Sequence, residues 1–218
     1  MYDAFDYAKY YIKCGLDTNR NTFDGNMKLQ KLLVFADLIS LAELNKPLFK
    51  DDILAFAQGC VVEKVRLRYK NNCEDFVSDS EQFSPDFPED EYSVLDLCAS
   101  IFGGLSAREL SEINHSFDFW RNAYQKSFQS SGYRDKSKAV VSIDSMLAEI
   151  SKVKEMISAY RETKTENKYK EIINGVYFYY DNNSLLSDDV LDELFEFSLT
   201  ADEPAYTLCM DNERLVIF

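Results

Sequence analysis

Histidine is almost absent from this sequence of 218 residues, which contains one, His115. Any Ser-His or Cys-His nucleophilic system, and any metal site with several histidines, would have to include this residue. A hydrolytic dyad can be drawn with the neighbouring Ser111, Glu112, Ser116 or Asp118. A single histidine beside a tryptophan is more often a hydrogen-bonded structural residue. We therefore expect no catalytic residues, and a hydrolase that uses His115 is the least favoured alternative.

Glycine is also scarce, with seven residues, and neither the P-loop spacing nor the dinucleotide fingerprint occurs. This excludes the common classes of nucleotide-dependent enzyme. The five cysteines are scattered and never lie within two residues of one another, so they match neither a zinc-ligand pattern nor a disulfide frame. We expect reduced thiols, no metal, no cofactor and no small-molecule substrate.

Long apolar runs are missing as well. No segment approaches the roughly 20 apolar residues of a membrane-spanning helix, and the first six residues lack the basic and then apolar order of a signal peptide. We expect a cytoplasmic protein without a membrane partner.

Basic residues are in the minority, since 38 acidic and 24 basic residues give a net charge of −14. This charge repels phosphate backbones, so we expect no nucleic-acid partner. Arg66, Arg68 and Lys70 flank Tyr69 in a pattern that could stack on a single strand, but the patch is short and is expected to pair with nearby carboxylates. The charge favours a protein partner with a basic surface, although it could instead serve solubility.

Apolar spacing predicts two helices near the amino terminus. The first covers Tyr2 to Cys14 and is followed by a polar loop to Gly25. The second begins at Met27 and ends before Asn45, because Pro47 disfavours helical geometry in the residue before it. It is the strongest helix in the sequence, and four charged residues are expected mostly on the side opposite its apolar stripe: Lys28, Lys31, Asp37 and Glu43.

The next segments mix short elements and loops. Ile53 to Lys70 predicts two short elements joined by a buried turn at Gly59, and its valine-rich second half could be strand or helix. Ser78 to Asp90 has the composition of an exposed acidic loop. The acids Glu89 to Glu91 suit the first turn of a helix that stops at the pair of glycines 103 and 104.

Ser106 and Glu109 then form a capping box for a further helix. One long amphipathic helix is expected from Ser142 to Tyr169. The segments beyond it predict a strand at Val176 to Tyr180, a helix at Leu186 to Phe197, and a hairpin at Tyr206 to Phe218 that turns at Asp211 and Asn212. The fold is therefore expected to be mainly α: a compact multi-helix domain with minor β elements, followed by a long helix and a small α+β carboxy-terminal segment.

Four sequence pieces resemble the Panacea domain, also called the SocA-like antitoxin domain, and they occur in the family's order. The run M-K-L-Q-K-L-L-V-F-A-D from Met27 to Asp37 resembles its opening helix. Lys46 to Phe49 is similar to its G-K-P-L-F-type loop, and Ile53 to Val62 to its I-x-A-W-x-x-G-P-V-V element. Leu105 to Trp120 is similar to its L-S-x-x-E-L-S-x-L-T-H-x-x-x-P-W signature.

The chain departs from the family pattern where Phe56 replaces a tryptophan, Cys60 replaces the proline of Gly-Pro, and Phe119 replaces the proline of Pro-Trp. It therefore resembles a divergent member of a family that is associated with phages. The resemblance places a Panacea domain at residues 1–143, with a carboxy-terminal extension at 144–218. It implies a type II antitoxin that neutralises a cognate toxin by direct binding; the alternatives are a proteolytic adaptor and a prophage-encoded inhibitor of a host defence protein.

Two groups of candidate site residues follow. Residues of the family motifs are expected to be mainly structural and suited to buried hydrogen bonds: Lys28, Leu29, Gln30, Lys31, Leu32, Gly59, Val61, His115, Ser116, Asp118 and Trp120. Contacts to the partner are expected in the acidic loop and in the tyrosine-rich strand, because tyrosine is enriched in binding hot spots: Asp79, Glu81, Asp86, Glu89, Tyr177 and Tyr179.

Overall fold

The computed structural model describes residues 2–129, 132–165, 169–180, 186–211 and 214–217, and the chain divides into two compact units, Met1–Glu155 and Met156–Phe218. The first unit is helical around one β-hairpin, and the second contains a four-stranded sheet and one helix. The expected mainly α fold with minor β elements is thereby confirmed.

The elements follow one another in a simple order. In the first unit they are α1 (Ala4–Lys13), α2 (Phe23–Leu44), β1 (Ile53–Phe56), β2 (Gly59–Val62), α3 (Glu63–Asn71), α4 (Cys73–Gln82), α5 (Glu89–Phe102), α6 (Ala107–His115), α7 (Asp118–Lys126), the 3₁₀ turn η1 (Lys136–Lys138) and α8 (Ile143–Leu147). Helix α9 (Ile150–Thr165) crosses the division between the units, and β3 (Tyr169–Ile173), β4 (Val176–Tyr180), α10 (Asp188–Ser198), β5 (Ala205–Asp211) and β6 (Arg214–Ile217) follow it.

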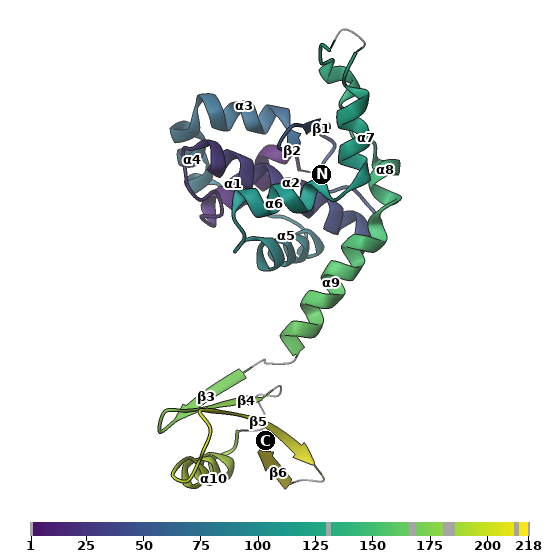
Figure 1. Ribbon diagram of the computed structural model, residues 1–218. Helices are drawn as coiled ribbons and strands as arrows, with labels where there is room; N and C mark the ends of the chain where they lie inside the picture. Colours follow the sequence, from purple (N-terminus) through teal and green to yellow (C-terminus); the bar gives the residue numbers. More distant parts are fainter. Residues whose placement is uncertain (1, 130–131, 166–168, 181–185, 212–213, 218) are drawn as a thin grey trace. The chain divides into compact units, whose positions relative to one another are not determined.

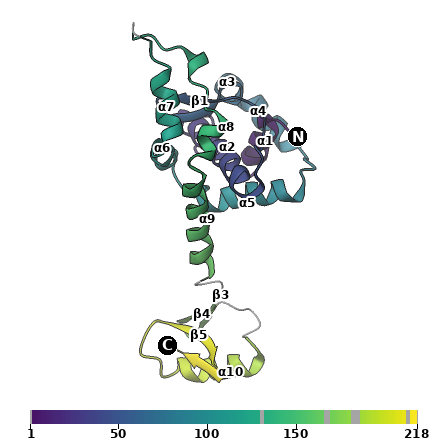
Figure 2. The same ribbon diagram turned by 90° about the vertical axis from the view of Figure 1, so that its right-hand side faces the viewer.

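Helix α2 occupies the centre of the first unit. It packs against α1, α3, β2, α5 and α6, and Figures 1 and 2 both show it between α3 above and α5 below. The Thr22 side chain caps its first turn, and Asn45 ends it in the left-handed conformation that asparagine tolerates. The predicted end of this helix is therefore confirmed.

Every residue of α2 from 28 to 42 is buried, so the expected solvent side does not exist. The prediction for Lys28, Lys31 and Asp37 is wrong, whereas Glu43 is exposed as expected. The reason is that each buried charge binds backbone groups of a neighbouring segment. Lys28 Nζ donates to the Gly103 carbonyl at 2.8 Å, and Asp37 Oδ1 accepts from the Leu48 amide at 2.7 Å.

Strands β1 and β2 form an antiparallel hairpin in which Ile53 pairs with Val62 and Phe56 with Gly59. The two alternatives left open for the valine-rich segment both occur, because Val61 and Val62 end β2 and α3 begins at Glu63. Beyond it, the first turn of acids in α5 and the capping box of Ser106 and Glu109 are both present.

Two predicted segments need correction. The expected loop at Ser78–Asp90 is helical up to Gln82, because Cys73, Phe76 and Ser80 recur at helical spacing and form the buried side of α4. The expected helix from Ser142 to Tyr169 is broken between α8 and α9, and Tyr169 already belongs to β3. At the break, Glu149 Oε2 accepts a hydrogen bond from the Phe119 amide at 2.8 Å, which draws this residue to the start of α7.

The second unit has the strand order β3-β4-β5-β6, with β4 and β5 parallel and the other pairs antiparallel. Leu194 of α10 packs with Phe178, Tyr180 and Leu208 on one face of the sheet. The predicted strand and helix of this region are confirmed. The carboxy-terminal hairpin is confirmed too, since Asp211 pairs with Arg214; the predicted turn residue Asn212 lies outside the described residues.

Candidate functional site

The β1–β2 hairpin is held by side chains from distant parts of the first unit. Lys31 Nζ donates to the Cys60 carbonyl at 2.9 Å, and Gln30 Oε1 accepts from the Val62 amide at 2.9 Å. Asn114 Oδ1 accepts from the Cys60 amide at 2.7 Å. Helices α2 and α6 therefore satisfy backbone groups that the short hairpin leaves unpaired.

The turn side of the hairpin is held in the same way. Ser111 Oγ donates to the Gln58 carbonyl at 3.0 Å, and Trp120 Nε1 donates to the Phe56 carbonyl at 2.8 Å. The His115 ring stacks on Trp120 with their centroids 4.0 Å apart. Two residues of the Leu105–Trp120 piece, Ser111 and Trp120, thus fix the turn of the hairpin that the Ile53–Val62 piece forms.

Gly59 begins β2 with φ +93°, a conformation that side chains other than glycine rarely adopt. A Cβ at this position would lie 2.5 Å from Asn114 Oδ1 and 2.8 Å from Lys31 Cε. The glycine is therefore required both by the backbone angle and by the close approach of two helices.

Lys31 is a fully buried cation. Its ammonium forms no ion pair with the described residues, and burial lowers its pKa to about 8. It is therefore still largely charged at neutral pH. Burial and the nearby Lys31 charge also lower the pKa of His115.

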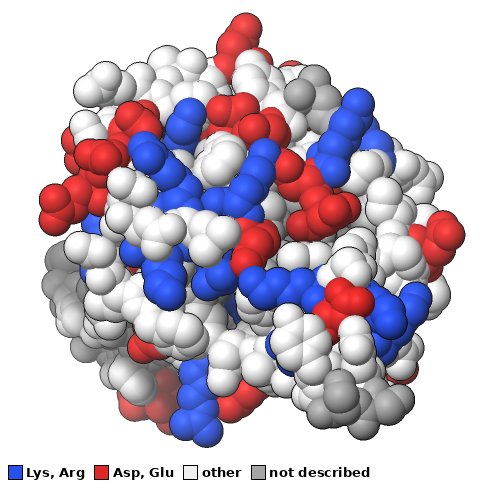
Figure 3. Space-filling model, turned by 90° about the horizontal axis from the view of Figure 1, so that it is seen from above, with Lys and Arg blue, Asp and Glu red and all other residues white. Residues whose placement is uncertain are grey.

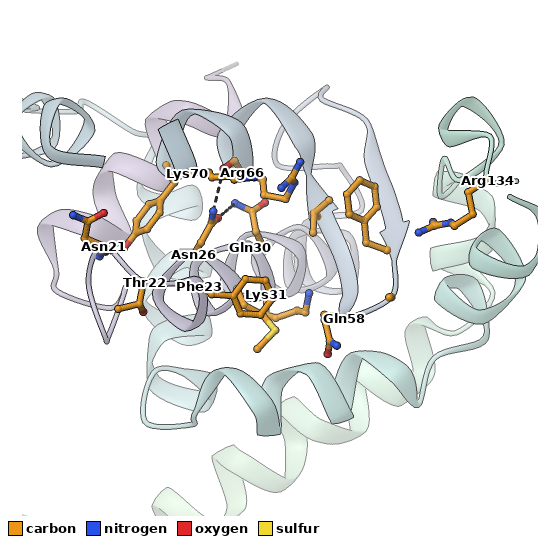
Figure 4. A pocket seen from close by; sticks show the side chains of 15 residues that line it. Asn21, Thr22, Phe23, Asn26, Gln30, Lys31, Gln58, Arg66, Lys70 and Arg134 are labelled. Carbon is orange, nitrogen blue, oxygen red and sulfur yellow. Dashed lines mark hydrogen bonds between the residues drawn. The ribbon is translucent and has the colours of Figure 1, made fainter. Parts of the chain in front are cut away.

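In front of the hairpin lies a cavity of about 510 Å³, which we call the α2–α3 pocket (Figure 4). Its residues come from the start of α2, the hairpin, α3 and the loop after α7. They are Asn21, Thr22, Phe23, Asn26, Met27, Gln30, Lys31, Phe56, Ala57, Gln58, Val61, Arg66, Tyr69, Lys70 and Arg134. A cavity of this size can enclose a drug-sized ligand or a few side chains of a partner.

The charge of the pocket is opposite to that of the chain. Four lining residues are basic, Lys31, Arg66, Lys70 and Arg134, and none is acidic, although the whole sequence has 38 acids against 24 bases. Figure 3 shows several groups of Lys and Arg side chains on one face, with Asp and Glu side chains between them. The pocket therefore favours a negatively charged group.

The structure brings most of the predicted motif residues together around the hairpin. Gly59 and Val61 belong to the hairpin itself, and it is surrounded by Gln30, Lys31, His115 and Trp120. Leu29 and Leu32 are fully buried in α2, and Lys28 binds the end of α5. Ser116 and Asp118 lie apart from this group, because Ser116 bonds the Ile113 carbonyl and Asp118 pairs with Arg121. The mainly structural role of the motif residues stays a prediction.

The predicted partner contacts belong to both units. Asp79, Glu81, Asp86 and Glu89 are exposed on α4, the following loop and α5, and Asp79 pairs with Arg68. Tyr177 and Tyr179 lie on the face of β4 that points away from α10, with their rings 6.5 Å apart. Tyr177 is 38% exposed.

The sequence does not identify the α2–α3 pocket as a site. Its one signal there is the basic and aromatic patch at Arg66 to Lys70, which is predicted to pair with carboxylates. Arg66 does pair with Glu63, at 2.6 Å, but Arg66, Tyr69 and Lys70 also line the pocket. The contribution of Arg134 cannot be seen in the sequence, because only folding brings it to this wall.

Residues 29–121 match the family model described as antitoxin SocA-like, Panacea domain. This segment of the chain is similar to the Panacea domain. The matched segment runs from the middle of α2 to α7, so it includes the hairpin and the residues that hold it. No curated protein and no solved structure matches the chain.

Within the described residues, no group of three or more His, Cys, Asp or Glu side chains is placed to hold a metal ion. All five cysteines are free thiols. No described helix is long and apolar enough to span a bilayer.

The stacking of His115 on Trp120 predicts a structural role that can be measured. His115→Ala should lower the free energy of unfolding by about 1 to 2 kcal/mol, because it removes the stack and leaves space beside the indole. Urea denaturation would test this, with Tyr133→Ala as a control, since Tyr133 is 71% exposed and its replacement should change stability by less than about 0.5 kcal/mol. Full stability combined with loss of partner binding would instead make His115 a contact residue.

Proposed function

We propose that this chain is an antitoxin that neutralises a cognate protein toxin by direct binding and catalyses no reaction. The observation that carries the proposal is the match of residues 29–121 to the antitoxin SocA-like Panacea domain. The stacking of the single histidine on Trp120, with ring centroids 4.0 Å apart, agrees with the non-catalytic part of the proposal.

The architecture supports a binding role. The hairpin is fixed by side chains of α2, α6 and α7, so the pocket in front of it has a preorganised wall, which reduces the entropy lost when a partner binds. The family-motif residues would then maintain this wall, and partner selection would depend on the exposed residues around it.

The test is expression of the neighbouring genes of the chain in its native genome. A neighbour that stops growth when expressed alone should be tolerated when this chain is produced with it, and the two proteins should co-purify. Rescue with rapid loss of the toxin would indicate delivery to a protease, whereas rescue without a complex would contradict neutralisation by binding. A pull-down from the native host that recovers only a defence protein would favour the inhibitor alternative.

The tyrosine pair of β4 gives a separate prediction about the partner surface. Replacing both Tyr177 and Tyr179 with serine should weaken the complex by about tenfold, because large aromatic contacts would be removed from an exposed sheet face. Phe195→Ser is the matched control, since Phe195 is 47% exposed on α10. Titration calorimetry would measure both, and an unchanged affinity in the double variant would show that the partner does not use this face.

A further inference from the structure

We propose that the α2–α3 pocket binds a segment of the partner polypeptide in which a carboxylate side chain lies next to an aromatic or aliphatic one. The inference rests on the proposed function and specifies the chemistry of the bound segment. It assigns the pocket a ligand opposite in charge to the basic partner surface expected from the net charge of the chain.

The carboxylate is assigned from the cations of the pocket. Lys31 is fully buried and donates to the Cys60 carbonyl, so its ammonium supplies positive charge behind the pocket wall without contacting a ligand. Lys70 is exposed at the rim, and no hydrogen bond or ion pair joins it to another described residue. Arg66 is already engaged by Glu63. An incoming carboxylate would therefore pair with Lys70 at the rim, and a charge-assisted hydrogen bond in a partly enclosed site is stronger than a neutral one.

The apolar neighbour is assigned from the walls. Phe23 is 71% exposed, although it stands at the start of α2 beside the cavity. Met27, Phe56 and Val61 continue the apolar lining. A ligand side chain placed here would remove the exposed apolar surface of Phe23 from water, which favours binding.

A polypeptide fits the remaining polar groups better than a nucleic acid does. The Gln58 side chain has no hydrogen bond to another described residue, and Figure 4 shows it beside Lys31 at the hairpin turn. Its amide can both donate to and accept from a peptide backbone. A strand of several phosphates would be repelled by the net charge of −14, whereas one carboxylate needs only the local cations.

The experiment uses the full chain and two synthetic peptides. The first is an acetylated and amidated pentapeptide of sequence Leu-Phe-Glu-Phe-Gly, and the second has glutamine in place of glutamate. Calorimetry should show that the glutamate peptide binds about tenfold more tightly. Phe23→Ala and Lys70→Glu should each weaken this binding at least fivefold. Both residues are exposed, so the fold should be retained.

Matched controls lie away from the pocket in the same unit. Leu147→Ala removes a side chain that is 40% exposed on α8, and Lys154→Glu makes the same charge reversal on α9. Both should leave peptide affinity unchanged. The proposal is overturned if neither peptide binds, if both bind equally, or if the controls weaken binding as much as the pocket variants do. It is also overturned if thymidine octanucleotide or adenosine monophosphate binds at the pocket more tightly than the glutamate peptide.

Binding and neutralisation of the cognate toxin by the same variants distinguish this inference from the proposed function. If Phe23→Ala and Lys70→Glu weaken the toxin complex and the two controls do not, the pocket is part of the interface. If toxin neutralisation is unchanged in both pocket variants, the antitoxin function stands and the pocket assignment fails. If the glutamate peptide binds as expected but no toxin is neutralised, the pocket assignment stands and the antitoxin function fails.

Discussion

Gly59→Ala is expected to lower the free energy of unfolding by about 3 kcal/mol or more, which is a large fraction of the stability of a typical domain. Two effects add at this position. The new methyl group would be held at φ +93°, and it would lie within 2.8 Å of both Asn114 Oδ1 and Lys31 Cε. Because both neighbours bind the Cys60 backbone, moving them would break hydrogen bonds of the hairpin. Chemical denaturation would measure the loss.

Gly15→Ala is the matched control for Gly59→Ala. Gly15 has φ +71°, but nothing lies within 4 Å of a Cβ built on it. Its replacement should therefore show the cost of the backbone angle alone, about 1 kcal/mol. Equal losses at both positions would show that the helices around Gly59 yield to the methyl group, and the close approach would then contribute nothing.

The contribution of Asp37 to the stability of the first unit is expected to fall as the pH rises from about 4 to about 7. Burial raises the pKa of this carboxyl to about 7, although the Leu48 and Phe49 amides act in the opposite direction. In that range Asp37 keeps its proton in the folded state and has released it in the unfolded state. The free energy of unfolding therefore falls with each pH unit. The loss should reach roughly 4 kcal/mol near pH 7 and be constant above it.

Asp37→Asn isolates this effect, because asparagine does not titrate and its oxygen can still accept from the Leu48 amide. Unfolding of both proteins by urea at several pH values would give the difference in stability between them. That difference should change by several kcal/mol between pH 4 and 7. Glu74→Gln is the control, at an exposed position of α4. It should leave the dependence of the unfolding free energy on pH as it is in the parent. A constant difference between parent and Asp37→Asn would contradict the raised pKa.

Features that depend on a few neighbouring residues could be predicted from the sequence. The capping box of Ser106 and Glu109 and the acidic first turn of α5 are local hydrogen-bond and dipole effects. The end of α2 is set by Asn45 and Pro47, which also act locally. The same holds for the strand of β4, whose aromatic and β-branched residues suit a sheet.

The burial of Lys28, Lys31 and Asp37 could not be predicted from the helix pattern, because a charged residue is normally placed on the solvent side. These three side chains are buried because backbone groups far along the chain need partners, such as the Gly103 carbonyl for Lys28. The break at Glu149 has the same origin, since its carboxylate binds the amide of Phe119 at the start of α7. Long-range hydrogen bonds of this kind have no local signature.

The α2–α3 pocket was hidden for a further reason. The net charge of −14 describes the whole sequence and says nothing about how the charges are distributed. A pocket lined by basic residues and no acidic ones is compatible with that total. Arg66 and Arg134 line one cavity although they are far apart in the sequence. Only the fold shows that a strongly acidic protein presents a basic concave site.

The central position of α2 also has a consequence for the order of events on the ribosome. The helix is complete once Leu44 is made, but two of the elements that cover it, α5 and α6, end at Phe102 and His115. At typical elongation rates the roughly 70 intervening residues take about 4 to 14 s to be added. During that interval α2 lacks two of the helices that bury it, so its apolar side chains are not yet fully covered. The core of the first unit can form only after α5 and α6 have been synthesised.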